Sequence, residues 1–265
     1  MSNKDLTDIV EGTTRAILDS QPVKNITDPP TKSIGTAFGD MFDLCFGSLH
    51  EKAEKSRILH QKNIDDFKAS LTSNVEKIPE ENLMKPKLSV IGPALEASKY
   101  YYEEKEIRDM FEKLIVNSMD NRKASEVHPS FTEIIKQLSP LDAQNLRCFS
   151  TENQLPICEF RISQDSNSFN VIQTNLFISN PQCQNIDLQS VSMSSLNRLE
   201  LISIKYDLYF SNEKRYEAFK DLPFYKQFKM AETVTKRQIE IQKGIASITP
   251  LGRAFLNICL SPLPN

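Results

Sequence analysis

The stretch EVHPSFTEIIKQLSPLDAQ, residues 126–144, combines a histidine, two prolines and several acidic and hydroxyl side chains, and its spacing predicts two short helices that meet at a tight corner. Ser139 stands three residues before Asp142, with Pro140 between them. In a capping box the serine oxygen accepts a hydrogen bond from an amide of the first turn, and the acid accepts one from the serine amide. Proline has no amide N–H, so a proline in that turn leaves no donor without a partner. We therefore predict that Ser139 and Asp142 cap a helix and are not catalytic.

The first of these two helices is predicted to begin at Pro129, because proline suits the first helical position. Its buried stripe consists of apolar residues at helical spacing: Phe131, Ile134, Ile135 and Leu138. His128 precedes the proline and has neither a second histidine nor a cysteine close to it in the sequence. A structural role is therefore favoured for His128 over metal binding.

Helical patterns dominate the chain before this corner, so we expect residues 1–150 to form a helical bundle. Residues 5–19 are amphipathic, and a proline-rich linker follows them. A long helix is predicted to run to Ile78, and its narrow apolar seam steps by three and four: Ile64, Phe67, Leu71, Val75 and Ile78. Such a seam suits self-association into a homo-oligomer or a partner helix of the same chain. Pro93 is expected in the first turn of the next helix.

After Ser150 the pattern changes to that of strands. PICEFRIS alternates apolar and polar residues, as a half-buried strand does, and FNVIQTNLFIS follows as its partner. A helix that ends in LNRLELI then leads into a third strand, and RQIEIQKGIAS predicts a hairpin with its turn at Lys243 and Gly244. Thr249 and Pro250 begin a last helix. We expect a mainly α fold, α+β overall, in which residues 151–265 form a smaller winged-helix-like α+β module.

Composition narrows the classes of protein and of site. The five cysteines are widely spaced, odd in number and form no CxxC pair, which is typical of reduced thiols in a cytoplasmic protein. The sequence has only seven glycines and neither a GxGxxG nor a P-loop motif, so we expect no small-molecule cofactor. It begins without an apolar signal core and contains no apolar run long enough to span a bilayer.

Catalytic and metal sites are not recognisable in the sequence. There is no GxSxG motif, and His50 and His60 are ten residues apart, whereas a helix that binds zinc places two histidines four residues apart. Cys148 and His128 are the residue types of a catalytic dyad, but the helical pattern around Cys148 directs it to the core. We therefore expect no catalytic or metal-binding residues, and an enzyme with a site near His128 is the alternative.

The segment SIGTAFGDMFDLCFGSL is the most apolar and glycine-rich part of the chain. Its GxxxG spacing lets two helices approach closely, so a tightly packed internal helix is favoured. Asp40 and Asp43 prevent it from crossing a bilayer alone, but a helix of this kind can also lie on a membrane surface or insert as an oligomer. The candidate residues for helix packing or peripheral membrane contact are Gly35, Gly39, Phe42 and Phe46.

The C-terminal part also predicts a nucleic-acid interface. In a winged-helix domain one helix reads the groove and the hairpin touches the backbone. Basic residues outnumber acidic ones over residues 196–265, whereas acidic residues are in excess over residues 1–195. The expected contacts are Ser194, Asn197 and Arg198 on the helix, with Lys236, Arg237 and Lys243 on the hairpin. Winged-helix modules also serve as plain packing units between proteins.

Three stretches carry a family resemblance: the block that extends from KIPEENL at residue 77 to LDAQNL at residue 146, GTAFGDMFDLCFG before it, and ITPLGRAFLNICL near the end. Together they resemble the bacterial abortive-infection alpha family, and HPSFTEIIKQLSPLDA is the most specific part. The resemblance implies a role in phage defence, in which an infected cell stops growing or dies before phage matures. It brings no catalytic residues. Three mechanisms are left open: membrane action, a nucleic-acid-binding sensor or regulator, and an enzyme with a site near His128. The expected partner is nucleic acid or a phage component.

Overall fold

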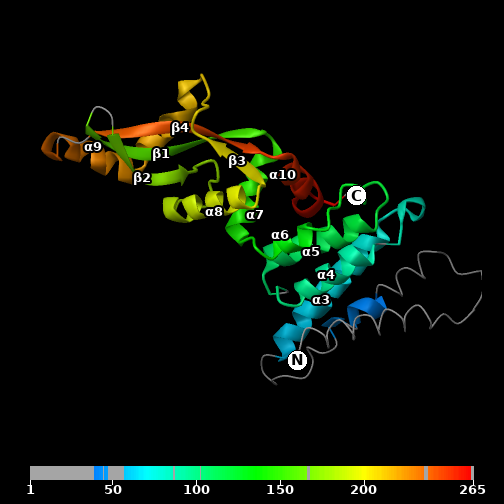
Figure 1. Cartoon of the computed structure of the whole chain (residues 1–265). Helices are drawn as coiled ribbons and strands as arrows, with labels where there is room; N and C mark the ends of the chain where they lie inside the picture. The colour runs from blue at the N-terminus through cyan, green and yellow to red at the C-terminus, as the bar shows by residue number, and fades with distance from the viewer. Residues whose placement is uncertain are drawn as a thin grey trace, which may run out of the picture.

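The structure, a computed structural model, describes residues 39–43, 45–46, 57–85, 87–101, 103–165, 168–235 and 238–263. Within them the chain is α+β, with a helical part and a four-stranded antiparallel sheet (Figure 1). None of the helices described is both long and apolar enough to cross a membrane. The predicted helix over residues 5–19, the linker after it, and His50 lie outside the described residues.

Among the described residues, the helical part comprises short helical pieces at 39–43 and 45–46, five further helices and two 3-10 turns. These are α3 (Arg57–Glu76), η2 (Glu80–Asn82), α4 (Leu88–Ser98), α5 (Lys105–Ser118), α6 (Phe131–Ile135), α7 (Pro140–Arg147) and η3 (Cys148–Ser150). The predicted long helix is observed as α3, which ends at Glu76 and not at Ile78, and every residue of the predicted seam is buried. The seam packs within the same chain, because its residues share one hydrophobic core with Phe111 and Leu114 of α5.

The corner at residues 126–144 is confirmed in its second half and corrected in its first. The Ser139 amide donates to Asp142 Oδ2 over 2.8 Å, and the Asp142 amide donates to Ser139 Oγ over 3.2 Å, so the capping box is complete. Pro129 does not begin α6, because Ser130 is the N-cap. His128 Nδ1 instead accepts a hydrogen bond from the Ser130 amide over 3.2 Å, which orders the residues before the helix.

Pro93 was also placed wrongly by the sequence pattern. It lies inside α4, which begins five residues earlier at Leu88, so it is an interior proline of that helix. The helix is strongly apolar, and Val90, Ile91, Ala94 and Leu95 are buried. Burial of this face stabilises α4. This stabilisation is larger than the cost of the single backbone hydrogen bond that the proline cannot make.

The sheet consists of β1 (Gln154–Asp165), β2 (Ser168–Leu176), β3 (Ile202–Lys205) and β4 (Ile239–Ile248), in the order β2-β1-β4-β3. The remaining elements are α8 (Ile186–Arg198), η4 (Glu213–Asp221), α9 (Pro223–Thr235), α10 (Pro250–Phe255) and the π-helix η5 (Leu256–Leu260). The predicted strand pair β1–β2, the helix α8 that leads to β3, and the Thr249 cap of α10 are confirmed.

The predicted hairpin turn at Lys243 and Gly244 is wrong, because both residues lie within the continuous strand β4. Lys243 is opposite Cys158 and Gly244 is opposite Ile157 in the ladder with β1. Glycine is required at position 244 by a close contact and not by a turn. A Cβ there would lie 2.7 Å from Cδ1 of the Tyr206 ring. The structure therefore has no wing at this position.

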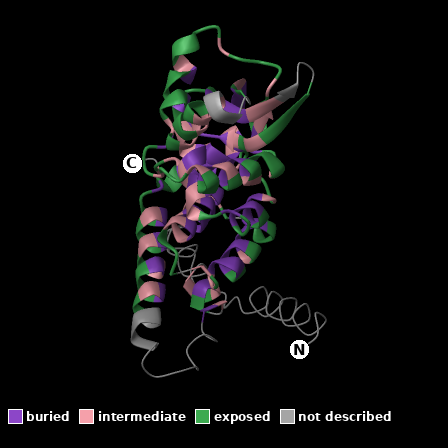
Figure 2. Cartoon of the chain, turned by 90° about the vertical axis from the view of Figure 1, so that its left-hand side faces the viewer, coloured by how far each residue is buried: buried purple, intermediate pink, exposed green. Residues whose placement is uncertain are grey.

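The two faces of the sheet are buried in different cores. Cys158 and Phe160 of β1 point to one face, where η4 contributes Tyr216 and Phe219 to a small core. Leu155 and Ile157 point to the other face and join a larger core. That larger core contains Phe111, Phe131, Met193, Leu196, Phe255 and other residues from both sides of residue 150. Figure 2 shows buried residues concentrated where the helical part meets the sheet. The division of the chain at residue 150 remains a prediction.

The C-terminal segment fixes the sheet to the helical part. Lys113 Nζ of α5 donates to the Leu260 carbonyl over 2.9 Å, and Asn117 Nδ2 donates to the Ile258 carbonyl over 2.8 Å. The rings of Phe131 and Phe255 meet edge to face with centroids 5.3 Å apart. In a π-helix the backbone carbonyls do not make the usual α-helical hydrogen bonds. Side chains of α5 donate hydrogen bonds to two such carbonyls in η5.

Candidate functional site

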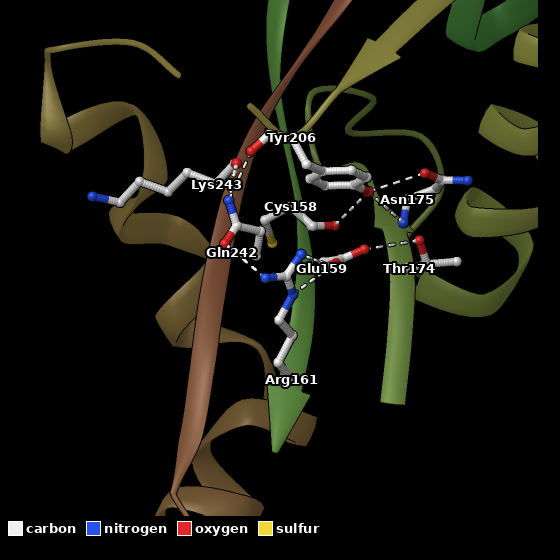
Figure 3. A network of polar contacts seen from close by, with 8 residues as sticks. All are labelled: Cys158, Glu159, Arg161, Thr174, Asn175, Tyr206, Gln242 and Lys243. Atoms are coloured by element: carbon white, nitrogen blue, oxygen red, sulfur yellow. Dashed lines mark hydrogen bonds and ion pairs between the residues drawn. The ribbon is translucent and has the colours of Figure 1, made fainter. Parts of the chain in front are cut away.

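A buried charged pair lies on the face of the sheet that carries Ile157 (Figure 3). Glu159 is 7% exposed, although its strand predicted an exposed side chain there. Arg161 Nε donates to Glu159 Oε1 over 2.5 Å, and Arg161 Nη1 donates to Gln242 Oε1 of β4 over 3.0 Å. Thr174 of β2 is the second donor to the Glu159 carboxylate, over 3.5 Å. We call these four residues the Glu159 cluster.

Tyr206, which follows β3, covers the sheet beside this cluster (Figure 3). Its hydroxyl accepts a hydrogen bond from the Asn175 amide over 3.0 Å and lies 3.0 Å from Asn175 Oδ1 and 3.4 Å from the Cys158 carbonyl. Burial raises the pKa of Tyr206 to about 12, and the nearby Glu159 carboxylate acts in the same direction. Tyr206 is therefore a neutral hydrogen-bonding group at physiological pH and not a general base.

The Glu159 cluster joins three strands, and its carboxylate is already paired. Removing one partner of such a buried pair leaves an uncompensated charge, whereas the intact pair specifies one arrangement of the strands. Arg161 is further held by Phe169 of β2, whose ring centroid lies 4.1 Å from the guanidinium carbon. The geometry indicates a structural role in β1–β2–β4 pairing.

An open cleft of about 670 Å³ lies at the other end of the sheet, where β4 runs into α10. We call it the Arg215/Arg253 cleft. Its polar and aromatic lining includes Asn153, Gln154, Phe210, Arg215, Ser247 and Arg253. Gln154 faces Ser247 in the ladder, and Gln154 Nε2 donates to Ser247 Oγ over 3.2 Å. The cleft is on the η4 side of the sheet, opposite the Glu159 cluster.

The two arginines of the cleft have different partners. Arg215 Nη2 lies 2.6 Å from Glu152 Oε2, and its guanidinium carbon is 4.0 Å from the centroid of the Phe210 ring. Arg253 Nη2 donates to the neutral amide oxygen of Asn153. Two guanidinium groups and one carboxylate therefore line the cleft, and the net charge of its lining is positive.

A smaller cleft of about 350 Å³ lies between α3 and α5. Lys77, Lys113, Asp109 and Glu112 line it, so its charges balance. Burial lowers the pKa of Lys113, and the positive charge of Arg147 lowers it further. Its ammonium group is occupied by the Leu260 carbonyl. With balanced charges in its lining, this cleft offers no surplus charge to a ligand.

The predicted nucleic-acid residues on α8 are exposed but bonded within the chain. Ser194 Oγ donates to the Ser190 carbonyl over 2.7 Å, and Asn197 Oδ1 accepts a bond from the Ile204 amide over 3.1 Å. Arg198 Nη1 donates to Gln137 Oε1 over 3.1 Å. These three residues lie together on α8, near the helical part.

Lys243 does not join them. Its ammonium group pairs with Glu213 of η4, on the face of the sheet opposite to the one that Met193 and Leu196 of α8 cover. In Figure 1, α8 and the segment that contains η4 lie on opposite sides of the sheet. Lys236 and Arg237 lie outside the described residues. The structure therefore does not bring α8 and Lys243 to one surface.

Two of the four candidates for helix packing or membrane contact are buried in the larger core. The rings of Phe42 and Phe46 stack 4.3 Å apart, and Phe67 of α3 packs against both. A Cβ at Gly39 would have no atom of the described residues within 4 Å, so the helices that the structure describes do not require glycine there. Gly35 lies outside the described residues.

The residues weighed as a catalytic dyad have separate partners. His128 Nδ1 lies 2.7 Å from Ser130 Oγ, whereas Cys148 Sγ lies 3.6 Å from the carbonyls of Gln144 and Ser179. Burial raises the pKa of Cys148, which disfavours the reactive thiolate. Across the described ranges, no group of three or more His, Cys, Asp and Glu residues is placed to hold a metal ion.

Sequence reasoning did not find the Arg215/Arg253 cleft. Its two arginines lie in η4 and α10, and only the folded sheet brings them together. The surplus of basic residues in the C-terminal part was the one signal that pointed to this region. That surplus was assigned to α8 and a hairpin, because neither arginine belongs to a recognisable motif.

Comparison with known proteins gives one match. The family model described as abortive infection alpha matches residues 59–259, from within α3 to within η5. No curated protein and no solved structure matches the chain. The family match covers the helical part, the sheet and the C-terminal segment that joins them, which is more than half of the chain. The chain therefore belongs to the abortive infection alpha family.

Proposed function

We propose that this protein acts in bacterial defence against phage by abortive infection, in which the infected cell stops growing or dies before phage matures. The observation that carries the proposal is the family match over residues 59–259. It includes most of α3, the capped corner at α6 and α7, the whole sheet and most of η5. The proposal therefore concerns the folded chain as a unit and not one short motif.

The test is a phage challenge of a susceptible bacterium that expresses the chain. One culture receives fewer phages than cells, and another receives an excess of phages over cells. Protection of the first culture, with growth arrest or lysis of the second, is the expected result. A strain with an empty vector is the first control. A strain that expresses Phe111→Asp, in which a charge replaces a fully buried ring, is the control for an unfolded chain.

Two results would contradict the proposal. Equal plaque numbers and equal growth with and without the protein, over a broad panel of phages, would leave it without a defence phenotype. Survival at both phage ratios would show defence without death or arrest of the infected cell. Both results are read against the amount of soluble protein in the same cells.

For the mechanism, we propose that the segment of Phe42 and Phe46 acts on a membrane after it leaves the helical part. Support comes from its two stacked rings, which pack against the ring of Phe67 and would be exposed by release. Exposed aromatic side chains on an amphipathic helix favour the membrane interface. Phe67→Ala, which loosens this contact, should then raise toxicity and membrane permeability in uninfected cells.

The matched control for Phe67→Ala is Leu71→Ala, which removes another buried side chain of the same seam but none of the recorded ring contacts. A permeability dye and viable counts are measured for both variants. An equal effect of the two variants would attribute toxicity to general loosening of α3. An intact membrane in cells that Phe67→Ala kills would contradict the membrane mechanism and leave abortive infection itself in place.

A further inference from the structure

We propose that the Arg215/Arg253 cleft binds a small phosphorylated molecule of nucleotide size. Its volume, about 670 Å³, is in the range of roughly 300–1,000 Å³ that small-molecule sites occupy. The proposal does not depend on the proposed defence function, because it concerns binding by the purified chain. It rests on the shape, the charges and the rigidity of the cleft.

The charge of the cleft selects an anion. Arg215 has a carboxylate partner in Glu152, but the recorded partner of Arg253 is the neutral amide of Asn153. Within the described residues no ion pair of Arg253 with a carboxylate is found, although the protein as a whole is acidic. A bound anion would supply that missing charge. It would also compete with Glu152, whose side chain is 52% exposed, for Arg215.

Phosphate is the anion that this arrangement fits. A guanidinium group is planar and offers paired N–H donors that match two oxygens of one phosphate. The amide of Gln154 and the hydroxyl of Ser247, which are bonded to each other over 3.2 Å, also line the cleft and add neutral polar groups. The ring of Phe210 lies against the Arg215 guanidinium, 4.0 Å from its carbon, and the rest of the ring adds apolar surface to the lining.

Hydrogen bonds hold the wall of the cleft that β1, β4 and α10 form. The Ile248 amide donates to the Asn153 carbonyl over 3.0 Å, at the end of the β1–β4 ladder. Thr249 Oγ1 accepts a bond from the Gly252 amide over 2.9 Å and so fixes the start of α10, which carries Arg253. Rigid walls reduce the entropy that binding costs.

A small ligand is favoured over a nucleic-acid strand. Binding along a strand neutralises several phosphates and uses many Lys and Arg residues over an extended surface. Here the excess positive charge is confined to two arginines that share one cleft with Glu152. One or two neighbouring phosphate groups are the match for such a site.

The test is calorimetric titration of the full chain with adenosine, AMP, ATP and inorganic phosphate, together with thermal unfolding in the presence of each. AMP or ATP should bind and raise the unfolding temperature, and adenosine should do neither. Arg253→Gln should weaken binding at least about tenfold, because it removes hydrogen bonds from a charged donor. Lys214→Gln removes a positive charge from an exposed position next to Arg215 and should leave affinity within about twofold.

A second variant separates binding from folding. Gln154→Glu places a carboxylate in the cleft at an exposed position and should abolish binding with little change in the unfolding temperature of the free protein. The proposal is overturned if no phosphorylated probe binds at millimolar concentration, or if both cleft variants bind like the parent. It is also overturned if adenosine binds as well as AMP. Binding only to oligonucleotides, with affinity that rises with their length, would replace it with a nucleic-acid surface.

Discussion

The ring of Tyr206 lies directly over Gly244, so that a Cβ on the glycine would stand 2.7 Å from Tyr206 Cδ1 and 2.8 Å from the Lys205 carbonyl oxygen. The hydroxyl of the same ring reaches the Asn175 amide at the end of β2, 3.0 Å away. One side chain thus links β4 to β2 across the strand that lies between them, β1 (Figure 3). The absence of a side chain at position 244 leaves the space that the ring occupies.

Gly244→Ala should destabilise the protein by about 1–3 kcal/mol, because the added methyl group forces the Tyr206 ring or the backbone to move. Gly92→Ala is the matched control. A Cβ at position 92 would meet no atom within 4 Å among the described residues, and alanine favours a helix over glycine by up to about 1 kcal/mol. Urea unfolding of both variants is the measurement. Equal stability of Gly244→Ala and the parent would contradict the contact.

Tyr206→Phe should make stability less sensitive to alkaline pH. Burial raises the pKa of Tyr206 to about 12 in the folded state, whereas a tyrosine in an unfolded chain titrates near pH ~10. The contribution of the raised pKa is therefore complete below pH ~10 and is lost as pH rises toward 12, because only the unfolded chain releases the proton in that window. Phenylalanine has no such proton.

The measurement is urea unfolding of the parent and of Tyr206→Phe at pH 8 and at stepwise higher pH. At pH 8 the variant should be less stable by about 1–3 kcal/mol, because the Asn175 amide loses its acceptor. The difference between the two proteins should shrink as pH rises above ~10. A constant difference across the series would show that the hydroxyl is not buried in the folded state.

A buried network of amide side chains between α7 and α8 should be sensitive to one substitution. Asn145 Nδ2 donates to Gln189 Oε1 over 2.7 Å and to Ser192 Oγ over 2.9 Å, and Asn145 Oδ1 accepts from Asn180 Nδ2 over 2.8 Å. Asn145→Ala leaves these buried partners without bonds and should cost on the order of 2–4 kcal/mol. The exposed Gln137→Ala should stay within about 0.5 kcal/mol of the parent in the same urea series. A change below 1 kcal/mol in Asn145→Ala would mean that water replaces the network.

The sequence predicts a feature of this protein correctly when the residues that determine the feature are close together in the chain. The caps at Ser139 and Thr249 were predicted correctly, because the residues that form them are within three positions of each other. The seam of α3 was correct for the same reason, since helical spacing alone decides which residues share a face.

The sequence-based predictions were wrong where residues that are far apart in the sequence determine the structure. Glycine in a turn and glycine under a neighbouring ring look alike in sequence, so Gly244 was assigned to a hairpin although Tyr206 is the reason for it. Glu159 was expected on an exposed face, because nothing near it in the sequence announces the cover that Tyr206 and Gln242 provide. The pairing of Arg215 and Arg253 in one cleft depends on the order of the strands, which local patterns do not contain.

Thiol labelling should separate the five cysteines by their burial. Cys158 and Cys259 are fully buried, and burial raises the pKa of both thiols well above the ordinary value. Burial also raises the pKa of the half-buried Cys45 and Cys148, though less. Native labelling with iodoacetamide at pH 8, followed by peptide mass spectrometry, should modify Cys183 first and Cys158 and Cys259 only in urea. Early modification of Cys158 in the native protein would contradict the packing of β1 against η4.

The Glu159–Arg161 pair should behave as a structural unit in a double-mutant cycle. The side chains are 9% and 20% exposed, so removal of one partner leaves the other charge largely buried. Glu159→Gln and Arg161→Met alone should each cost on the order of 3 kcal/mol, and the double variant should cost clearly less than their sum, because it leaves no unpaired charge. Urea unfolding gives the four stabilities, and the exposed pair of Lys136 and Glu133 provides a reference cycle with a coupling below about 1 kcal/mol. Additive losses at Glu159 and Arg161 would show that the two charges are independently solvated, and a functional role of the cluster would then be the better interpretation.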